Sequence, residues 1–589
     1  MSPDLPPVVP SVTAELVAAL SPRLRKRLDA GVTKLLARPI TRDGDTVRVA
    51  VDDATDLVLH APGGAVTGAD AIHCGCLLAP DCLHRAAAAS AAPVADETPP
   101  ETREVRETAS SEQPGSTTDG TAADADVATP AQHTAAREVF DAAAAVLEAG
   151  TDGAGAVLQA QLLHAAHTAR LAGLPRASAA AVSVVTAVRA ARTADPAYRL
   201  PDLADALADV LGVAHRLPHA TGADLAALRG TVRQPYRPDG SLRLYGLFSE
   251  PVLTDTGYAG AVTWTADADG RLYTVSDVAP GGPARATGAA DRTVRIGDTA
   301  LTHRELSRAG LAVSGATVSP TGRLGAGAGV RAVRASGAAW HSAPLDRLWS
   351  VPAAEQVARA LGGGQDLLFL EVTLVGTVRE STGDCLLADC GGVSLRLAAA
   401  HDDPALPYRD NLRLLAAAGG SRLRIVARLA PGPYPRALLL AAEHPTDSGA
   451  RVDLGLDRMQ RADLAAGAVA SPSAAVSAGG EAPLHVVRRR VHQTVSGGRR
   501  VLSFNGDARG DAARLRRHGL ATAADLLDDL LDAAADRSRD PFGRLLPTDP
   551  DRFARSWLAA AVYTDTVERT LCAHAWSAPT PEAPALSTT

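Results

Sequence analysis

The stretch AIHCGCLLAPDCLHRAAAA, residues 71–89, decides how the N-terminal part of this chain folds. It places three of the six cysteines of a 589-residue chain in the pattern C-x-C-x5-C-x-H. Three thiolates and one imidazole form a tetrahedral zinc site that leaves no coordination position for a substrate. We therefore expect one structural Zn²⁺, and its expected ligands are Cys74, Cys76, Cys82 and His84.

The spacing of these ligands also predicts local structure. Residues two apart on a strand share a face, so Cys74 and Cys76 should converge on one ion while His73 faces away. On a helix, residues two apart diverge by about 200° at 3.6 residues per turn. Cys82 should therefore precede the helix whose first turn contains His84.

Other readings of the cysteines are weaker. C-x-C differs from the C-x-x-C of thioredoxin-like redox sites, and a catalytic zinc would need an open position. Because zinc with three thiolates carries a net negative charge, Arg85 is expected to temper it. A second zinc site from Cys385, Cys390, Cys572 and His574 is conceivable. However, the odd separation of the first two along one strand puts them on opposite faces and favours free thiols.

Composition divides the rest of the chain into parts, because strand-like, helical and polar stretches alternate. Residues 91–133 hold nine acidic and two basic residues, which by themselves account for the net charge of −7. We expect an α+β multidomain protein. Its expected parts are a ββα zinc-finger region at 1–90, an acidic disordered linker at 91–134, an all-helical domain at 135–220, a β-rich mixed domain at 240–362, a small β-barrel at 363–445, a linker at 446–483 and a mostly helical C-terminal region at 484–577.

Two of these parts carry a finer expectation. Five strand-like pieces within 367–443 and a short helix near 410–417 fit an oligonucleotide/oligosaccharide-binding (OB) barrel. Such barrels stack bases on aromatic residues, and this one offers only Tyr408 and Tyr434, which favours a structural or protein-binding role. At 485–504, HVVRRRVHQT and RRVLSF around a Ser-Gly-Gly turn suggest a hairpin.

Several function classes are disfavoured. The chain's only lysines are Lys26 and Lys34, which excludes a P-loop and any Schiff-base lysine beyond the N-terminal region. No nucleophile elbow, H-E-x-x-H or kinase motif is present, so we expect no enzymatic activity and infer no small-molecule substrate. The N-terminal residues resemble no secretory signal and no apolar run reaches membrane-spanning length, so we expect a cytoplasmic protein without membrane contact.

A basic segment precedes the cysteines and offers a second hypothesis. Residues 21–50 hold eight basic and three acidic residues, enough for electrostatic contact with DNA. The candidate nucleic-acid contacts are Arg23, Arg25, Lys26, Arg27, Lys34 and Arg38. DNA binding by this segment together with the finger is the alternative to a protein-binding role.

The cysteine pattern with its preceding strands and following RAAAA helix resembles the SWIM zinc finger, whose pattern is C-x-C-x(n)-C-x-H. The stretch YGLFSEPVLTDTGYAGAVTWTADADGRLYTVSDVAPGG, residues 245–282, is similar to the middle region of actinobacterial proteins with an N-terminal SWIM finger. SWIM fingers are credited with binding DNA or proteins. The resemblance implies an adaptor that works with an AAA+ ATPase of the MoxR kind or a von Willebrand A-domain protein.

Overall fold

The protein is an α+β chain that divides into two compact units, as the sequence predicts for its fold class. The computed structural model describes residues 5–52, 55–95, 127–196, 198–231, 237–254, 258–297, 299–325, 327, 329–380, 383–447, 449–465, 483–503, 508–536, 540–544, 546 and 549–577. The first unit comprises residues 1–232 and 482–564, and the second comprises 233–481 and 565–589. Most of the first predicted linker (96–126 of 91–134) and about half of the second (466–482 of 446–483) lie outside the described residues.

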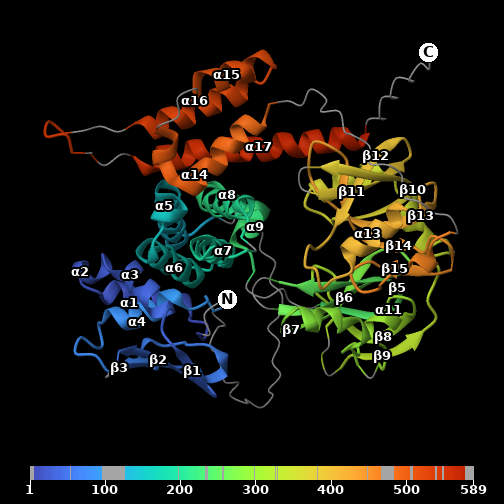
Figure 1. The fold of residues 1–589 in the computed structure, drawn as a ribbon, viewed down its shortest axis with the longest axis horizontal. Helices are drawn as coiled ribbons and strands as arrows, with labels where there is room; N and C mark the ends of the chain where they lie inside the picture. The colour runs from blue at the N-terminus through green and yellow to red at the C-terminus, as the bar shows by residue number, and fades with distance from the viewer. Residues whose placement is uncertain are drawn as a thin grey trace, which may run out of the picture. The chain divides into compact units, whose positions relative to one another are not determined.

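The first unit begins with a small sheet and the helices that cover one face of it (Figure 1). The helices are α1 (Pro10–Ala19), α2 (Pro22–Arg25), α3 (Leu28–Leu36) and α4 (Leu83–Ala91). The antiparallel strands are β1 (Ile40–Asp43), β2 (Thr46–Asp52), β3 (Thr55–His60) and β4 (Ile72–Cys74), in that order. Alternate strand residues such as Val47, Leu57 and Ile72 are buried against α1 and α4, which gives this region a core of its own.

The rest of the first unit is a helical domain built from two distant segments of the chain. Its helices are α5 (Pro130–Gly153), α6 (Ala156–Leu171), α7 (Pro175–Arg192), α8 (Leu200–Arg216), α9 (Gly222–Arg229), α14 (His485–Ser503), α15 (Ala508–Arg517), α16 (Ala521–Ala535) and, as far as Thr564, α17 (Pro550–Ser577). One hydrophobic core joins α5–α9 to α14–α17. The predicted helical parts 135–220 and 484–577 therefore pack together, although the second unit separates them in sequence.

The hairpin predicted at 485–504 is wrong, because residues 485–503 form α14. Val487, Val491 and Val495 lie four residues apart and are buried together, as one face of a helix requires. Gly498, with φ at +67°, kinks the helix where it crosses a matching kink at Gly150, whose φ is +68°. The contact is backbone against backbone, since a Cβ on Gly150 would lie 2.3 Å from the Gly498 nitrogen.

Polar contacts attach the finger region to the helical domain. The Asp29 carboxylate on α3 accepts a hydrogen bond from the Ala156 N–H at the start of α6, at 3.0 Å, and from Arg192 at 3.1 Å. Arg189, also on α7, donates to the Ala92 carbonyl just after α4, at 2.5 Å. Within the first unit, the finger region is thus packed against the helical domain and joined to it by hydrogen bonds.

The second unit contains two sheets. The first has the order β7-β6-β5-β8-β9. Its elements are β5 (Arg237–Leu253), β6 (Tyr258–Ala266), β7 (Leu272–Pro280), α10 (Pro283–Thr287), α11 (His303–Leu306), β8 (Gly310–Val318) and β9 (Arg331–Ala335). The short helix α12 (Ala353–Leu361) leads from this sheet to the next one.

The second sheet closes into a small barrel. Its elements are β10 (Leu367–Glu380), β11 (Gly383–Cys390), β12 (Val393–Ala399), α13 (Tyr408–Ala416), β13 (Arg422–Leu429), β14 (Arg436–Glu443) and β15 (Arg451–Asp453). A parallel pairing of β12 with β14 closes the order β10-β11-β12-β14-β13, and α13 lies between β12 and β13 in sequence. This connectivity is that of an OB barrel. Strand β15 extends it into a segment that the sequence assigns to a linker.

Candidate metal centre

The ligands of the expected zinc site lie at the junction of β4 and α4. Cys74 is the last residue of β4, where it pairs with Leu57 of β3. Cys82 is the N-cap of α4 with extended backbone angles, and His84 lies in the first turn of that helix. Both positions agree with the sequence prediction, since Cys82 and His84 would diverge by about 200° if both lay within the helix. Cys76 lies two residues beyond the end of β4, so this strand contains only the first of the paired cysteines.

The four ligand atoms converge as a metal site requires. One potential ligand atom from each of Cys74, Cys76, Cys82 and His84 lies within 4.8 Å of every other. Cys74 Sγ and His84 Nδ1 are 3.6 Å apart. Tetrahedral bonds of about 2.3 Å to sulfur and 2.05 Å to nitrogen would separate these two atoms by about 3.6 Å. The donor set therefore fits one Zn²⁺ with three thiolate ligands and one imidazole ligand.

The thiols also show why a cation suits this place. Burial raises the pKa of Cys74 to about 12 and also raises the pKa of Cys82. Although burial acts to raise it, the pKa of Cys76 is lowered, because its sulfur accepts hydrogen bonds from the Leu78 and Ala79 N–H groups and from the other two thiols. Three adjacent sulfurs cannot all ionise at low cost unless a metal ion compensates their charge.

The structure also shows where the other predicted residues near the ligands lie. His73 is exposed on the other face of the sheet, where its ring lies edge-on to His60 at 5.8 Å between centroids. It is therefore no ligand, as strand alternation predicts. The candidate nucleic-acid contacts on α2, α3 and the residues around them, Arg23, Arg25, Lys26, Arg27, Lys34 and Arg38, are all exposed.

Arg85 has a role that the sequence did not indicate. Its side chain is buried, and its guanidinium donates from Nε to the Ile72 carbonyl at 2.5 Å and from Nη1 to the Pro80 carbonyl at 2.6 Å. A further bond from Nη2 reaches the Ala69 carbonyl. Arg85 therefore fastens the strand before Cys74 to the loop before Cys82. A run of alanines around an arginine in a helix was the one available sign that this side chain is buried.

The other cysteines form no comparable group among the described residues. Cys385, Cys390 and Cys572 are free thiols, and burial raises the pKa of each. Within that part of the chain, the N-terminal cluster is the one group of metal-ligating side chains that lie close enough to share an ion. The conceivable second zinc site is therefore not assembled by the fold.

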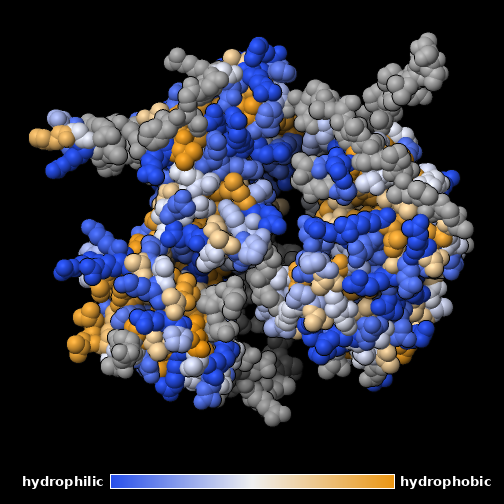
Figure 2. Space-filling view, viewed as in Figure 1, coloured by the Kyte–Doolittle hydropathy of each residue, from blue (hydrophilic) through white to orange (hydrophobic). Residues whose placement is uncertain are grey.

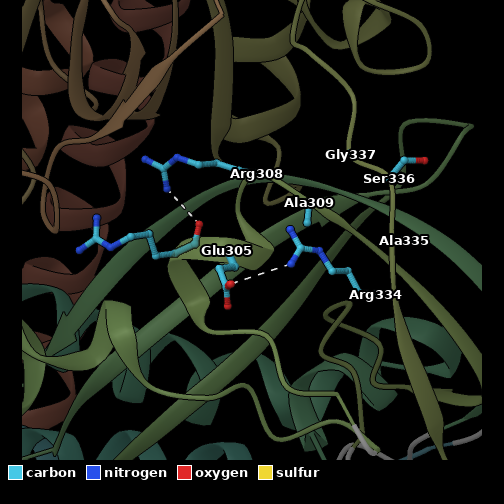
Figure 3. Close-up of a pocket in the computed structure, with 8 residues that line it drawn as sticks. Glu305, Arg308, Ala309, Arg334, Ala335, Ser336 and Gly337 are labelled. Carbon is cyan, nitrogen blue, oxygen red and sulfur yellow. Dashed lines mark hydrogen bonds and ion pairs between the residues drawn. The ribbon is translucent and has the colours of Figure 1, made fainter.

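The second unit has a polar pocket of about 640 Å³ between α11 and the end of β9 (Figure 3). It is lined by Arg304, Glu305, Arg308, Ala309, Arg334, Ala335, Ser336 and Gly337. Arg304 and Arg308 both bind Asp457, and Arg334 lies 4.0 Å from Glu305. These arginines already form ion pairs with carboxylates of the same unit. We therefore assign them a structural role, in which they hold segments of the fold together.

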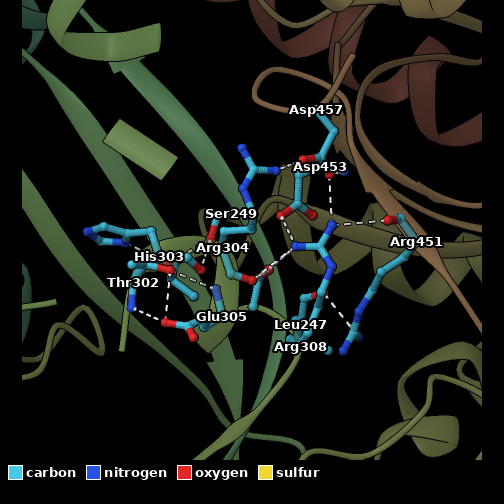
Figure 4. Close-up of polar contacts among 12 residues, drawn as sticks. Leu247, Ser249, Thr302, His303, Arg304, Glu305, Arg308, Arg451, Asp453 and Asp457 are labelled. Atoms are coloured by element: carbon cyan, nitrogen blue, oxygen red, sulfur yellow. Dashed lines mark hydrogen bonds and ion pairs between the residues drawn. The ribbon is translucent and has the colours of Figure 1, made fainter. Parts of the chain in front are cut away.

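Beside this pocket, Ser249, Thr263 and His303 form a closed chain of hydrogen bonds (Figure 4 shows Ser249 and His303). The Ser249 hydroxyl donates to the His303 carbonyl, so it accepts from Thr263, and the Thr263 oxygen accepts from His303 Nδ1 at 2.7 Å. Burial lowers the pKa of His303 to about 4, which keeps the ring neutral. All three side chains have no exposed surface, so a substrate cannot reach this hydroxyl–histidine arrangement.

Comparisons with known proteins add little. No family model matches the chain, and no curated protein matches it. One solved structure, described as "Structural mimicry for functional antagonism", is similar over 36% of this chain and 92% of its own at 10% identity, with a TM-score of 0.20. A likeness of that size carries no argument about this chain. Among the described helices, none has the length and apolar character needed to cross a membrane.

Proposed function

We propose that this chain is a zinc-stabilised interaction protein, in which a SWIM-type finger presents a recognition surface and the other domains serve as a scaffold. The convergence of the Cys74, Cys76, Cys82 and His84 ligand atoms within 4.8 Å is the observation that carries the proposal. A closed Cys3His set supports a structural metal, since all four positions are taken by protein. The C-x-C-x5-C-x-H spacing supports the assignment to the SWIM type.

The partner follows from the resemblance alone. By that resemblance the chain is an adaptor for an AAA+ ATPase or a von Willebrand A-domain protein in the cytoplasm. A non-enzymatic role agrees with the burial of Ser249, Thr263 and His303 and with the pairing of the pocket arginines to carboxylates. An adaptor needs a stable surface rather than a reactive group, and a metal-fastened loop provides one.

Metal analysis of the purified full chain tests the proposal. We expect about one zinc per chain, lost in Cys82→Ser and kept in Cys390→Ser, which removes a thiol elsewhere in the fold. The wild-type chain should bind a purified AAA+ ATPase or von Willebrand A-domain protein from its native host, and Cys82→Ser should not. A wild-type protein without zinc, or a Cys82→Ser variant that keeps it, contradicts the proposal.

DNA binding is the second candidate, because one specific observation favours it. The six candidate contacts named above are exposed, and no ion pair to any of them occurs within the described residues. Free cations on a surface can release counterions from a duplex, so binding should weaken steeply with salt. Neutralising Arg23, Arg25 and Arg27 should then reduce the slope, as measured by fluorescence anisotropy with a labelled duplex. A slope that is unchanged contradicts this candidate.

A further inference from the structure

The loop between the second and third cysteine ligands carries an unusually exposed apolar tip. The relative exposure of Leu77 is 104% and that of Leu78 is 63%, and the loop stays exposed through Asp81. Large apolar side chains this exposed and adjacent often mark an interaction site in a soluble protein.

This tip is held in a defined conformation. The Ala79 N–H donates to the Cys76 carbonyl at 3.1 Å, which closes a turn at the start of the loop. At the other end of the loop Arg85 holds the Pro80 carbonyl. A pre-ordered loop loses little conformational entropy when it binds, which favours recognition.

Cationic side chains lie on and around a helix that packs against the start of α4. Helix α3 packs on the start of α4, since a Cβ on Gly31 would lie 3.1 Å from Leu83. Leu36 of α3 adds further exposed apolar surface, at 36%. Figure 2 shows hydrophobic residues gathered at the edge of this region, next to a hydrophilic cluster over α2 and α3. The cations there are the six candidate contacts already described.

We propose that the Leu77–Leu78 tip and the α2–α3 cations form one docking surface for an acidic partner protein, which offers an apolar pocket bordered by carboxylates. This inference rests on the proposed function, because the metal holds the tip in place. The leucines fill the pocket, and the burial of their apolar surface stabilises the complex. The cations pair with the carboxylates and speed association, so binding weakens with salt.

Two observations favour a protein over a nucleic acid or an anionic membrane. Residues 1–95 contain no Phe, Tyr or Trp, so the surface has neither the rings that stack on bases nor those that settle at a membrane interface. A duplex would also leave the two leucines without an apolar partner.

Photo-crosslinking in the native host tests this surface. A benzophenone amino acid is placed at Leu78 of the full chain, and at Leu171 as a control, since Leu171 is 76% exposed on α6 of the same unit. The protein captured from position 78 is then purified and its affinity measured. We expect an acidic protein whose affinity falls at least tenfold for Leu77→Asp and for Lys34→Glu, and falls further with added salt. Leu171→Asp should leave the affinity unchanged.

Each other outcome overturns the inference. These outcomes are crosslinks to DNA or lipid and crosslinks no stronger than those at position 171. A captured protein whose affinity is unchanged by either substitution is the third. Zinc is measured in every variant. A surface variant that keeps about one zinc per chain but shows no specific crosslink refutes the docking surface alone, whereas a wild-type chain without zinc refutes the proposed function.

Discussion

Replacing Arg85 with lysine should weaken zinc binding even though the charge is kept. Arg85 donates hydrogen bonds to the carbonyls of Ala69, Ile72 and Pro80. A lysine ammonium on its single stem cannot span three carbonyls on two segments. The variant should therefore lose the bond to Pro80, which fastens the loop between Cys76 and Cys82.

The size of the effect follows from that one bond. A hydrogen bond from a charged donor contributes about 1.5–2 kcal/mol, near the lower end of the usual range. Each 1.4 kcal/mol corresponds to a factor of about ten in affinity. If the loop must be ordered again when it binds the metal, zinc affinity should fall by about ten- to thirtyfold in Arg85→Lys. The uncharged variant Arg85→Gln should be affected to a similar extent.

Competition with a chromogenic chelator at fixed pH measures these affinities in the full chain. Arg48→Lys, at an exposed position on β2, is the matched control and should bind zinc as the wild type does. An electrostatic role for Arg85 would instead leave Arg85→Lys unchanged and weaken Arg85→Gln and Arg85→Glu. Wild-type affinity in Arg85→Lys would therefore refute the carbonyl-binding role.

Three further predictions concern stability. Cys82→Ser should have a lower melting temperature than the zinc-loaded wild type, because the variant loses the metal. Added chelator should not lower the melting temperature of the variant further; a further drop would mean that the variant still binds metal. Gly150→Ala should lower the free energy of unfolding by about 3 kcal/mol or more in chemical denaturation, because φ is +68° and the new Cβ meets backbone, whereas Gly153→Ala should change it by about 1 kcal/mol or less. Burial lowers the pKa of His303 to about 4 and raises that of Asp453 to about 6. The stability that neutral His303 contributes is lost as pH falls below about 6.5, where the histidine of the unfolded chain becomes protonated. The stability that protonated Asp453 contributes is lost as pH rises through about 6. Between pH 7.5 and 5 the former costs about 2 kcal/mol and the latter contributes about 1.4 kcal/mol, so the wild type should change little. Over that interval Asp453→Asn should lose stability and His303→Asn should gain it, and equal pH profiles for both variants would contradict these assignments.

The sequence by itself determined the features that depend on local spacing. The Cys-x-His pair can converge only if Cys82 precedes the helix, and strand alternation excludes His73, so these features followed from periodicity. Cys76 lies just after β4 rather than on it, so strand alternation alone did not place that ligand. The strands of the barrel and the short helix α13 could also be predicted from the sequence, because each is a compact run with turn residues on either side.

Only the tertiary structure decided which distant segments meet. The valines of α14 are β-branched and suggested a strand, but packing against α5 makes them the buried face of a helix, which the crossing of Gly150 and Gly498 permits. Arg85 looked like a counter-charge because its carbonyl partners are backbone groups, which no sequence pattern marks. The exposure of Leu77 and Leu78 could not be predicted from the sequence for a similar reason. Whether an apolar residue is buried depends on what the fold brings against it, and the described residues leave Leu77 fully exposed and Leu78 largely exposed.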